Sequence, residues 1–204
     1  LLFYCFRDRD EALDLFELAT GQRMHPRYAQ VGGVAEDIPR GFERECRKLI
    51  RYLRGRIDEY DGLIKANPIW LERTVGIGVC PPEFAVQMGL TGPNLRAAGI
   101  PYDLRTANGG YGAYRELGYV PVVEQGGDAH ARFRVRVEEM RTSLDLIEKC
   151  LDGLPEGPTI ADDRKYVLPP RHELHTSMES LIHHFKLVTE GFRVPAGEVY
   201  AAIE

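Results

Sequence analysis

The apolar residues between Asp128 and Gly153 repeat with a regularity that strongly restricts the fold. They follow one another at intervals of 4, 3, 4, 3 and 4 positions and are Phe133, Val137, Met140, Leu144, Ile147 and Leu151. Because an α-helix turns once in about 3.6 residues, this spacing places all these side chains on one face. We therefore expect a long helix whose apolar stripe packs nearly parallel to a neighbouring helix.

A second stripe of the same kind occupies residues 42–64. Its apolar positions are Phe42, Cys46, Leu49, Leu53, Ile57, Tyr60 and Ile64. The other face carries charges of both signs, typical of a helix that contacts solvent or protein and not a phosphate backbone. Shorter helices are expected over Asp8–Thr20 and Glu173–Thr189. The apolar face of the last helix comprises Leu174, Met178, Leu181, Phe185 and Val188.

These patterns predict a mainly α chain, an antiparallel helix bundle with long loops rich in glycine and proline. Residues 76–127 hold only short helical turns opened by proline, at Pro82–Val86 and Pro93–Ala97. A loop region of this length is functional or is covered by another subunit. No repeat or change of composition divides the chain, so we expect residues 1–204 to form a single domain.

Composition excludes several classes of protein. The formal net charge of −5 argues against a nucleic-acid-binding surface. No apolar run approaches the roughly 20 residues that span a bilayer. The four cysteines lie far apart and form no CxxC pair, so we expect buried, reduced thiols. The glycine-rich stretches match neither GxGxxG nor GxxxxGK[ST], so nucleotide binding is unsupported.

The strongest hint of a metal site is a group of histidines near the end of the chain. Its members are His172, His175, His183 and His184. In HExxH zinc sites the histidines are four residues apart, whereas His172 and His175 are three apart. We therefore expect capping and packing roles for these side chains and no metal bound by this chain.

The connection from Gly21 to Val34 is the strongest functional candidate. It lies between two patterned helices and contains arginines, a histidine, a tyrosine and a double glycine. His25 has Arg23 and Arg27 as near neighbours, and nearby cations favour the neutral imidazole. An imidazole that titrates near neutral pH can exchange a proton when the local charge changes. A purely structural role for a single loop histidine is the alternative.

The stretch Leu15–His25 resembles the segment ElxTGxRMH of the 49-kDa-type subunit at the quinone site of NADH–quinone oxidoreductase, respiratory complex I. Further blocks follow in the family's order over nearly the whole chain. They are Gly32–Val34, Asp37–Pro39, Arg56–Tyr60, Leu90–Ala97, Pro101–Arg105, Thr176–Glu179, His183–Lys186, Gly191–Phe192 and Pro195–Tyr200. The family is related to the large subunit of nickel–iron hydrogenases, which binds its metal through cysteine pairs. Because this chain has no such pair, it resembles the quinone-reducing branch.

The resemblance implies a hydrogenase-large-subunit-like fold and a role in NADH:quinone oxidoreduction coupled to ion translocation. It implies that His25 is a redox-linked proton group beside the terminal 4Fe-4S cluster of a partner subunit. Arg23, Met24 and Arg96 would support the quinone pocket or the cluster side, with structural salt bridges as the alternative for the arginines. The chain itself would bind no cofactor. Its expected partners are the other peripheral-arm subunits and quinone, on the cytoplasmic side of the inner (plasma) membrane.

The family pattern has parts that this chain does not match. The quinone-headgroup histidine and tyrosine belong to an N-terminal segment, and a C-terminal segment follows Glu204 in the family, so we expect a central fragment that is inactive alone. Asn108–Tyr114 and Asp128–Arg132 also depart from the family's usual sequence. Two alternatives therefore stay open: a non-catalytic assembly or structural module, and a divergent subunit of a membrane-bound hydrogenase-like complex.

Overall fold

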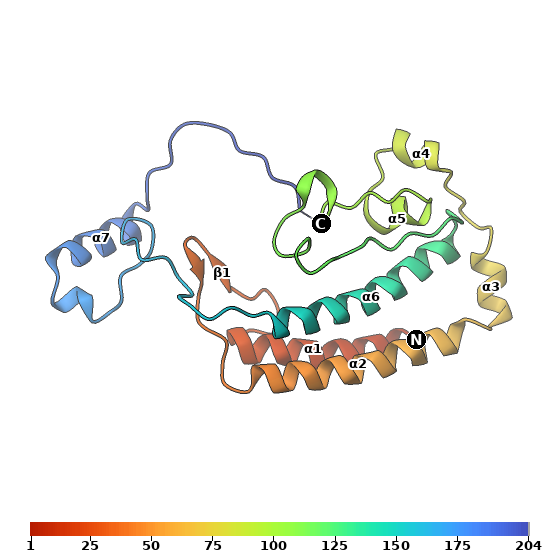
Figure 1. Cartoon of the computed structure of the whole chain (residues 1–204), viewed down its shortest axis with the longest axis horizontal. Helices are drawn as coiled ribbons and strands as arrows, with labels where there is room; N and C mark the ends of the chain where they lie inside the picture. Colours follow the sequence, from red (N-terminus) through yellow and green to blue (C-terminus); the bar gives the residue numbers. More distant parts are fainter. Residues whose placement is uncertain (204) are drawn as a thin grey trace. The chain divides into compact units, whose positions relative to one another are not determined.

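The computed structural model describes residues 1–203 and is mainly helical, which confirms the mainly α part of the predicted fold class. In chain order its elements are α1 (Leu2–Thr20), β1 (Ala29–Gln30), β2 (Gly33–Val34), α2 (Phe42–Ile64), α3 (Pro68–Thr74), α4 (Pro82–Gln87), α5 (Gly92–Ala97), η1 (Ala107–Gly109), α6 (Ala129–Asp152), η2 (Glu173–His175) and α7 (Met178–Thr189) (Figure 1). The two short strands pair antiparallel in a hairpin. Among the described residues no helix is both long enough and apolar enough to cross a bilayer.

The contacts divide the chain into two compact units. The first unit comprises residues 1–9, 43–154 and 201–203, and the second comprises residues 10–42 and 155–200. The expectation that residues 1–204 form a single domain stays a prediction.

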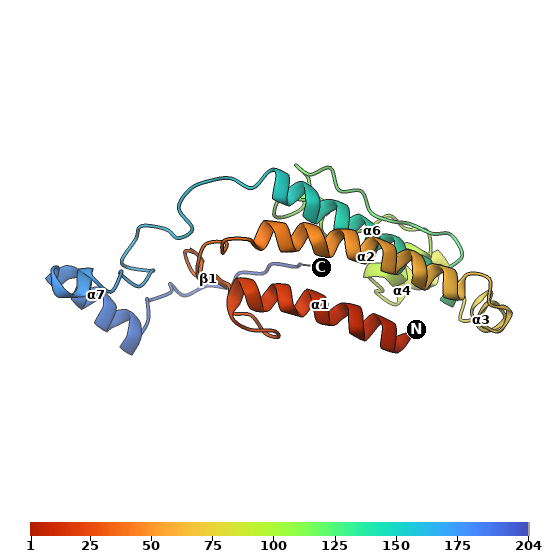
Figure 2. The same cartoon turned by 90° about the horizontal axis from the view of Figure 1, so that it is seen from below.

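Helices α2 and α6 lie side by side and antiparallel within the first unit (Figures 1 and 2). Near the start of α2, Arg47 Nη2 lies 2.7 Å from Asp152 Oδ1 at the end of α6. Further along α2, Asp58 Oδ1 lies 3.0 Å from Arg141 Nη2, earlier in α6. Because the pairs run in opposite directions along the two helices, the helices must be antiparallel. Part of the charged face of α2 is therefore occupied by salt bridges with α6.

The buried side chains of these helices match the predicted stripes only in part. Those of α2 are Cys46, Ile50, Ile57, Tyr60 and Ile64, and those of α6 are Ala131, Val135, Val137, Leu144 and Leu146. Met140 and Ile147 of the predicted α6 stripe are exposed, whereas Val135 is fully buried. The reason is that α6 is covered on a second face, where Ala97 of α5 packs against Ala131 and Val135. A single stripe describes a helix with one neighbour, and α6 has more than one.

The helical turns predicted at Pro82–Val86 and Pro93–Ala97 are present as α4 and α5, and α3 precedes them. Asn67 caps α3 by accepting hydrogen bonds from the backbone N–H groups of Ile69 and Trp70, and Pro68 occupies its first turn. Trp70 packs edge-on against Phe133 of α6, with ring centroids 5.3 Å apart. These contacts and the packing of α5 against α6 attach residues 68–97 to α6.

Helix α1 begins at Leu2, six residues before the predicted start at Asp8. The carboxylate of Asp8 is buried and accepts hydrogen bonds from Arg7, Tyr52 and Tyr60. Burial raises the pKa of Asp8, but these donors outweigh it and lower the pKa to about 2. An ionised, buried carboxylate therefore fixes the first turns of α1 to α2.

The prediction of one continuous helix over Glu173–Thr189 is wrong. It divides into η2 and α7, and Ser177 between them is extended and caps α7 by accepting a hydrogen bond from the N–H of Ser180. The Glu173 carboxylate, bound by Arg164 at 2.7 Å and by the Ser180 hydroxyl at 3.1 Å, stabilises this break. The apolar face of α7 is also exposed, with Phe185 at 66% and Val188 at 62%.

The predicted start of α6 is confirmed by a well-formed cap. Asp128 Oδ1 accepts a hydrogen bond from the backbone N–H of Ala131 at 2.7 Å, and Oδ2 accepts one from that of Gly76 at 2.8 Å. Burial raises the pKa of the Asp128 carboxyl, but the two N–H donors outweigh it, so the pKa is lowered. One side chain thus begins the helix and fixes the loop at Gly76.

Replacing Asp128 by alanine is expected to destabilise the first unit by about 1–2 kcal/mol, because the cap is lost and the Gly76 N–H loses its acceptor. Asp128→Asn keeps an oxygen acceptor and should cost less. Urea unfolding followed by circular dichroism measures both values. Equal losses for the two variants would contradict the capping role.

Candidate functional site

The loop that carries His25 begins at a closed helix end. The N–H of Gly21 donates to Glu17 O at 2.8 Å, and Gly21 has the left-handed φ of +73° typical of a helix stop. The Thr20 hydroxyl donates to Phe16 O at 2.8 Å and accepts from the Gln22 N–H at 3.2 Å. The predicted end of the helix at Thr20 is confirmed, and these bonds fix the direction in which the loop leaves α1.

The other end of the loop is held by the β1–β2 hairpin. Gly32 O accepts the N–H of Ala161 at 2.8 Å, and the Val34 N–H donates to Thr159 O at 3.0 Å. A Cβ on Gly33 would lie 2.2 Å from Thr159 O, closer than any real contact. A Cβ on Gly32 would lie 2.3 Å from Val167 Cγ2, so both glycines are required by later segments of the chain, and the loop is anchored at both ends.

His25 lies exposed in the middle of this anchored loop. Its φ of +55° is in the left-handed region, which is uncommon for a residue other than glycine. Met24 beside it is also exposed, at 54%. Backbone in this region is retained where the surroundings determine it and is frequent at functional sites. The imidazole is thus presented on the surface by a constrained backbone.

Arg23 points back onto α1. Its guanidinium forms ion pairs with Asp10 and Asp14, and Nη1 lies 3.5 Å from Glu17 Oε2. The hydrogen bond to Asp14 is the main cause of the raised pKa of Arg23. Exposed ion pairs each add little stability. Their effect here is to define the course of the loop and to offset the positive charge beside His25.

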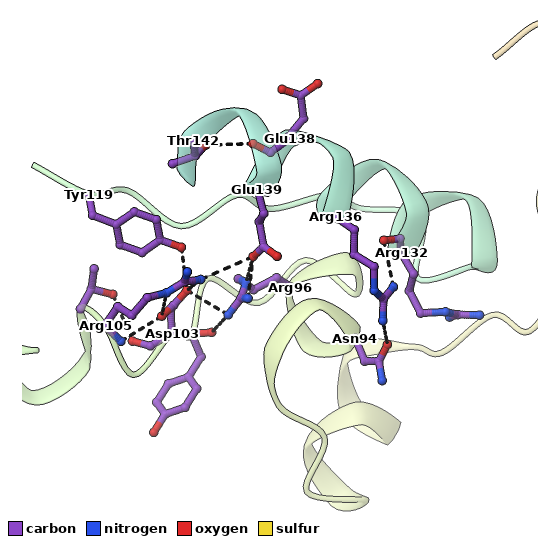
Figure 3. Close-up of polar contacts among 12 residues, drawn as sticks. Asn94, Arg96, Asp103, Arg105, Tyr119, Arg132, Arg136, Glu138, Glu139 and Thr142 are labelled. Atoms are coloured by element: carbon purple, nitrogen blue, oxygen red, sulfur yellow. Dashed lines mark hydrogen bonds and ion pairs between the residues drawn. The ribbon is translucent and has the colours of Figure 1, made fainter. Parts of the chain in front are cut away.

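Arg96 lies in the other unit, in a buried group of charges that we call the ionic cluster (Figure 3). Arg96 Nη2 donates to Glu139 Oε1 at 2.6 Å, and Nη1 lies 3.0 Å from Asp103 Oδ2. Asp103 also accepts from Arg105 Nη2 at 2.6 Å and from the Tyr119 hydroxyl at 2.9 Å. The side chains of Arg96 and Asp103 are 1% and 0% exposed. Of the two roles left open for Arg96, salt bridging is the one with contacts in this chain.

The ionic cluster keeps its charges because they compensate one another. Burial raises the pKa of Asp103, but the hydrogen bonds from Arg105 and Tyr119 lower it to about 2. The pKa of Arg105 is raised, mainly by its bond to Asp103. Burial, followed by the bond to Asp103, raises the pKa of Tyr119. At neutral pH the cluster therefore holds a charged Arg105, an ionised Asp103 and a neutral Tyr119 phenol.

The sequence patterns identified Arg96 but not the rest of the cluster. Asp103 and Arg105 were noted only within a block of family resemblance, and Glu139 lies 43 residues from Arg96 without any local signal. Correlated charge substitutions among relatives could have revealed the pairing, whereas one sequence cannot. The structure groups Arg23, Met24 and His25 in one loop of the second unit and places Arg96 in the first.

The histidines weighed as metal ligands have other surroundings. His172 and His175 flank and end η2, and His183 Nε2 lies 3.7 Å from Glu179 Oε1 on α7. Over residues 1–203, no three His, Cys, Asp or Glu side chains are arranged to hold a metal ion. The cysteines of the described chain are all unbridged, but only Cys46 is buried, and Cys150 is exposed.

Comparison with known proteins identifies the family. Residues 1–204 match the family model of the 49 Kd subunit of respiratory-chain NADH dehydrogenase. The chain belongs to this 49 kDa subunit family. An NADH-quinone oxidoreductase subunit of Chloroflexus aurantiacus is 45% identical over 207 residues, covering 100% of this chain and 50% of that protein. NADH-quinone oxidoreductase subunit 4 of Thermus thermophilus is 47% identical over 202 residues, covering 99% of this chain and 49% of that protein.

Membership of the 49 kDa subunit family confirms the resemblance inferred from the TGxRMH segment and the later blocks. The relatives are named as subunits of an NADH-quinone oxidoreductase. The chain spans about half the length of the curated relatives it matches.

Proposed function

We propose that this chain forms one wall of the quinone-reduction site of an NADH–quinone oxidoreductase, next to the terminal 4Fe-4S cluster of a partner subunit. The observation that carries the proposal is the exposed imidazole of His25 on a loop anchored at both ends, within a chain of the 49 kDa subunit family. Electrons from NADH would arrive through clusters in other subunits, and the energy of quinone reduction would drive ion translocation.

His25 is assigned the role of a redox-linked proton group. Its ring is exposed and has no hydrogen bond or ion pair to residues 1–203, so it is available to a neighbouring subunit. The partner's cluster, when present, supplies one-electron storage. An added electron in a poorly solvated site favours a proton nearby, and His25 can accept that proton. We assign the cluster's ligands to the partner and none to this chain.

The other site residues act through position. Arg23, held by the carboxylates of α1, determines the path of the loop, and Met24 adds an exposed apolar side chain beside His25. Arg96 supports its part of the subunit from within, through the ionic cluster. We propose a hydrogenase-large-subunit-like arrangement for the complete subunit, placed peripherally on the cytoplasmic side of the membrane, with quinone as substrate.

His25→Ala in the assembled complex is expected to weaken the pH dependence of the partner cluster's midpoint potential. If His25 takes up the proton, the slope should fall from roughly 59 mV per pH unit, the value for one proton per electron, towards zero. Quinone reduction should continue at least in part, because the histidine is not the reacting group. Redox titration followed by EPR at several pH values measures the slope.

The matched control is His172→Ala, another exposed histidine in the same unit but at the start of η2. This variant should keep the original slope. A slope unchanged by His25→Ala, or lowered equally by His172→Ala, would rule out the assigned role.

A further inference from the structure

A pocket of about 230 Å³ lies in the second unit at the C-terminal end of α7. It is formed by the last turns of that helix, the chain that follows it, and the segment around residue 165. Its lining residues are Lys165, Tyr166, His183, Lys186, Leu187, Glu190, Gly191, Phe192 and Arg193. None of them belongs to the His25 loop or to the ionic cluster, so the proposed function does not use this pocket.

The pocket is lined by cations that have no carboxylate partner among the described residues. Lys165, Lys186 and Arg193 form no ion pair within residues 1–203. By contrast, the neighbouring Arg164 has ion pairs with Asp162 at 2.8 Å and with Glu173 at 2.7 Å. Glu190 also lines the pocket and removes one charge, which leaves a formal excess of two positive charges. Unpaired cations that converge on one cavity favour binding of an anion.

The walls of the pocket increase the effect of these charges. Tyr166 and Phe192, which both line the pocket, pack edge to face with ring centroids 5.5 Å apart. Leu187 adds a further apolar surface. Apolar walls lower the local dielectric constant, so a charge between them interacts more strongly than it would on open surface. The turn of the chain at Gly191, whose N–H donates to Lys186 O at 3.1 Å, brings Phe192 and Arg193 back towards α7.

We propose that this pocket, hereafter the α7 pocket, binds a phosphate group. An arginine fork and two lysine ammonium groups are the side chains that proteins use for phosphate. The volume is below the roughly 300–1,000 Å³ of sites that enclose a whole drug-sized ligand, so the pocket suits a single headgroup. The phosphate can belong to a phospholipid or to a small soluble phosphate compound.

The surroundings of the α7 pocket favour the phospholipid source. Phe185 and Val188, which flank Lys186 and Leu187 in the sequence of α7, are 66% and 62% exposed. A helix with an exposed apolar side beside basic residues is typical of binding at an anionic membrane surface. If the ligand is instead a small soluble phosphate compound, its binding should not depend on these apolar side chains.

The test measures binding of the full chain to two probes, inorganic phosphate by isothermal titration calorimetry and lipid vesicles by sedimentation. The vesicles are phosphatidylcholine alone, or phosphatidylcholine with about one-fifth phosphatidylglycerol to supply anionic headgroups. Lys186→Gln combined with Arg193→Gln should weaken binding at least about tenfold, because charge-assisted hydrogen bonds are lost. The control pair, Arg40→Gln with Arg171→Gln, removes the same charge from exposed positions outside the pocket and should bind normally.

Each outcome of these binding measurements either supports or overturns the proposed phosphate site. Pocket-dependent binding to the anionic vesicles supports the site and its lipid source, and Phe185→Ser should then weaken vesicle binding but not phosphate binding. Pocket-dependent binding to phosphate alone supports the site with a soluble ligand. Absence of binding to both probes, or equal losses in the pocket pair and the control pair, overturns the proposal. Circular dichroism of each variant checks that α7 is intact. The outcome is independent of the His25 experiment.

Discussion

Arg96→Met is expected to lower the free energy of unfolding of the first unit by about 3–5 kcal/mol, the largest single-residue loss that we predict for this chain. Removing one partner of a buried ion pair leaves the opposite charges without compensation. Here the substitution would leave Asp103, which is 0% exposed, without one of its cations, and Glu139 without its 2.6 Å donor. Because small domains have stabilities of only about 5–15 kcal/mol, such a loss would remove a large part of the unit's stability.

Chemical denaturation followed by far-ultraviolet circular dichroism measures this loss. Arg136→Met is the matched control, since Arg136 is an exposed arginine on α6 that, among residues 1–203, bonds only to Asn94 and to the carbonyl of Arg132. The control should change the stability by no more than about 0.5 kcal/mol. Arg96→Lys keeps the charge but cannot reproduce the guanidinium fork, so its loss should be intermediate. A value for Arg96→Met equal to the control would show that the ionic cluster contributes nothing.

The first unit is also expected to lose stability steeply between about pH 4 and pH 2. The folded-state pKa values of Asp8 and Asp103 are lowered to about 2, from an ordinary value of 3.8. A lowered pKa means that the stabilisation is fully present above the unfolded value and is lost as the pH falls through the folded value. For Asp103 the linked free energy is about 2 kcal/mol. Near neutral pH neither carboxylate makes the stability depend on pH.

Tyr119→Phe removes one donor to Asp103, so the acid limb should become shallower and move towards pH 4. Tyr60→Phe should act in the same way through Asp8. Tyr200→Phe, at a phenol that is 87% exposed, is the control and should leave the limb unchanged. Unfolding free energies measured at intervals from pH 2 to pH 7 give the curves. Identical acid limbs in all four proteins would show that these hydrogen bonds do not lower the carboxylate pKa values.

The helices could be predicted from the sequence because their determinants are local. Proline and asparagine at residues 67–68 begin α3, the Asp128 side chain begins α6, and Gly21 ends α1. Apolar spacing then predicted most of the buried positions of α2. The failures in predicting which apolar side chains are buried share one cause, which is the number of elements that cover a helix. Val135 is buried because a second element covers α6, and the face of α7 is exposed because no described element covers it.

The family could be identified from the sequence because short segments such as the one that ends at His25 are specific in themselves. The geometry of these segments could not be predicted from the sequence. The double glycine of the hairpin is explained by Thr159 and Val167, more than a hundred positions later in the chain. The positive φ of His25 and the ion pairs of Arg23 likewise depend on how the chain returns to α1.

The sequence alone therefore determined the helical class, several helix ends, the family and the candidate histidine, since each rests on residues close together in the chain. Tertiary structure decided which charges are buried, how they are paired and where cations remain unpaired. Arg96 and Glu139, or Lys165 and Arg193, meet only after distant segments pack. Burial then sets the strength of their interactions, because the cost of removing a charge from water depends on everything that surrounds it.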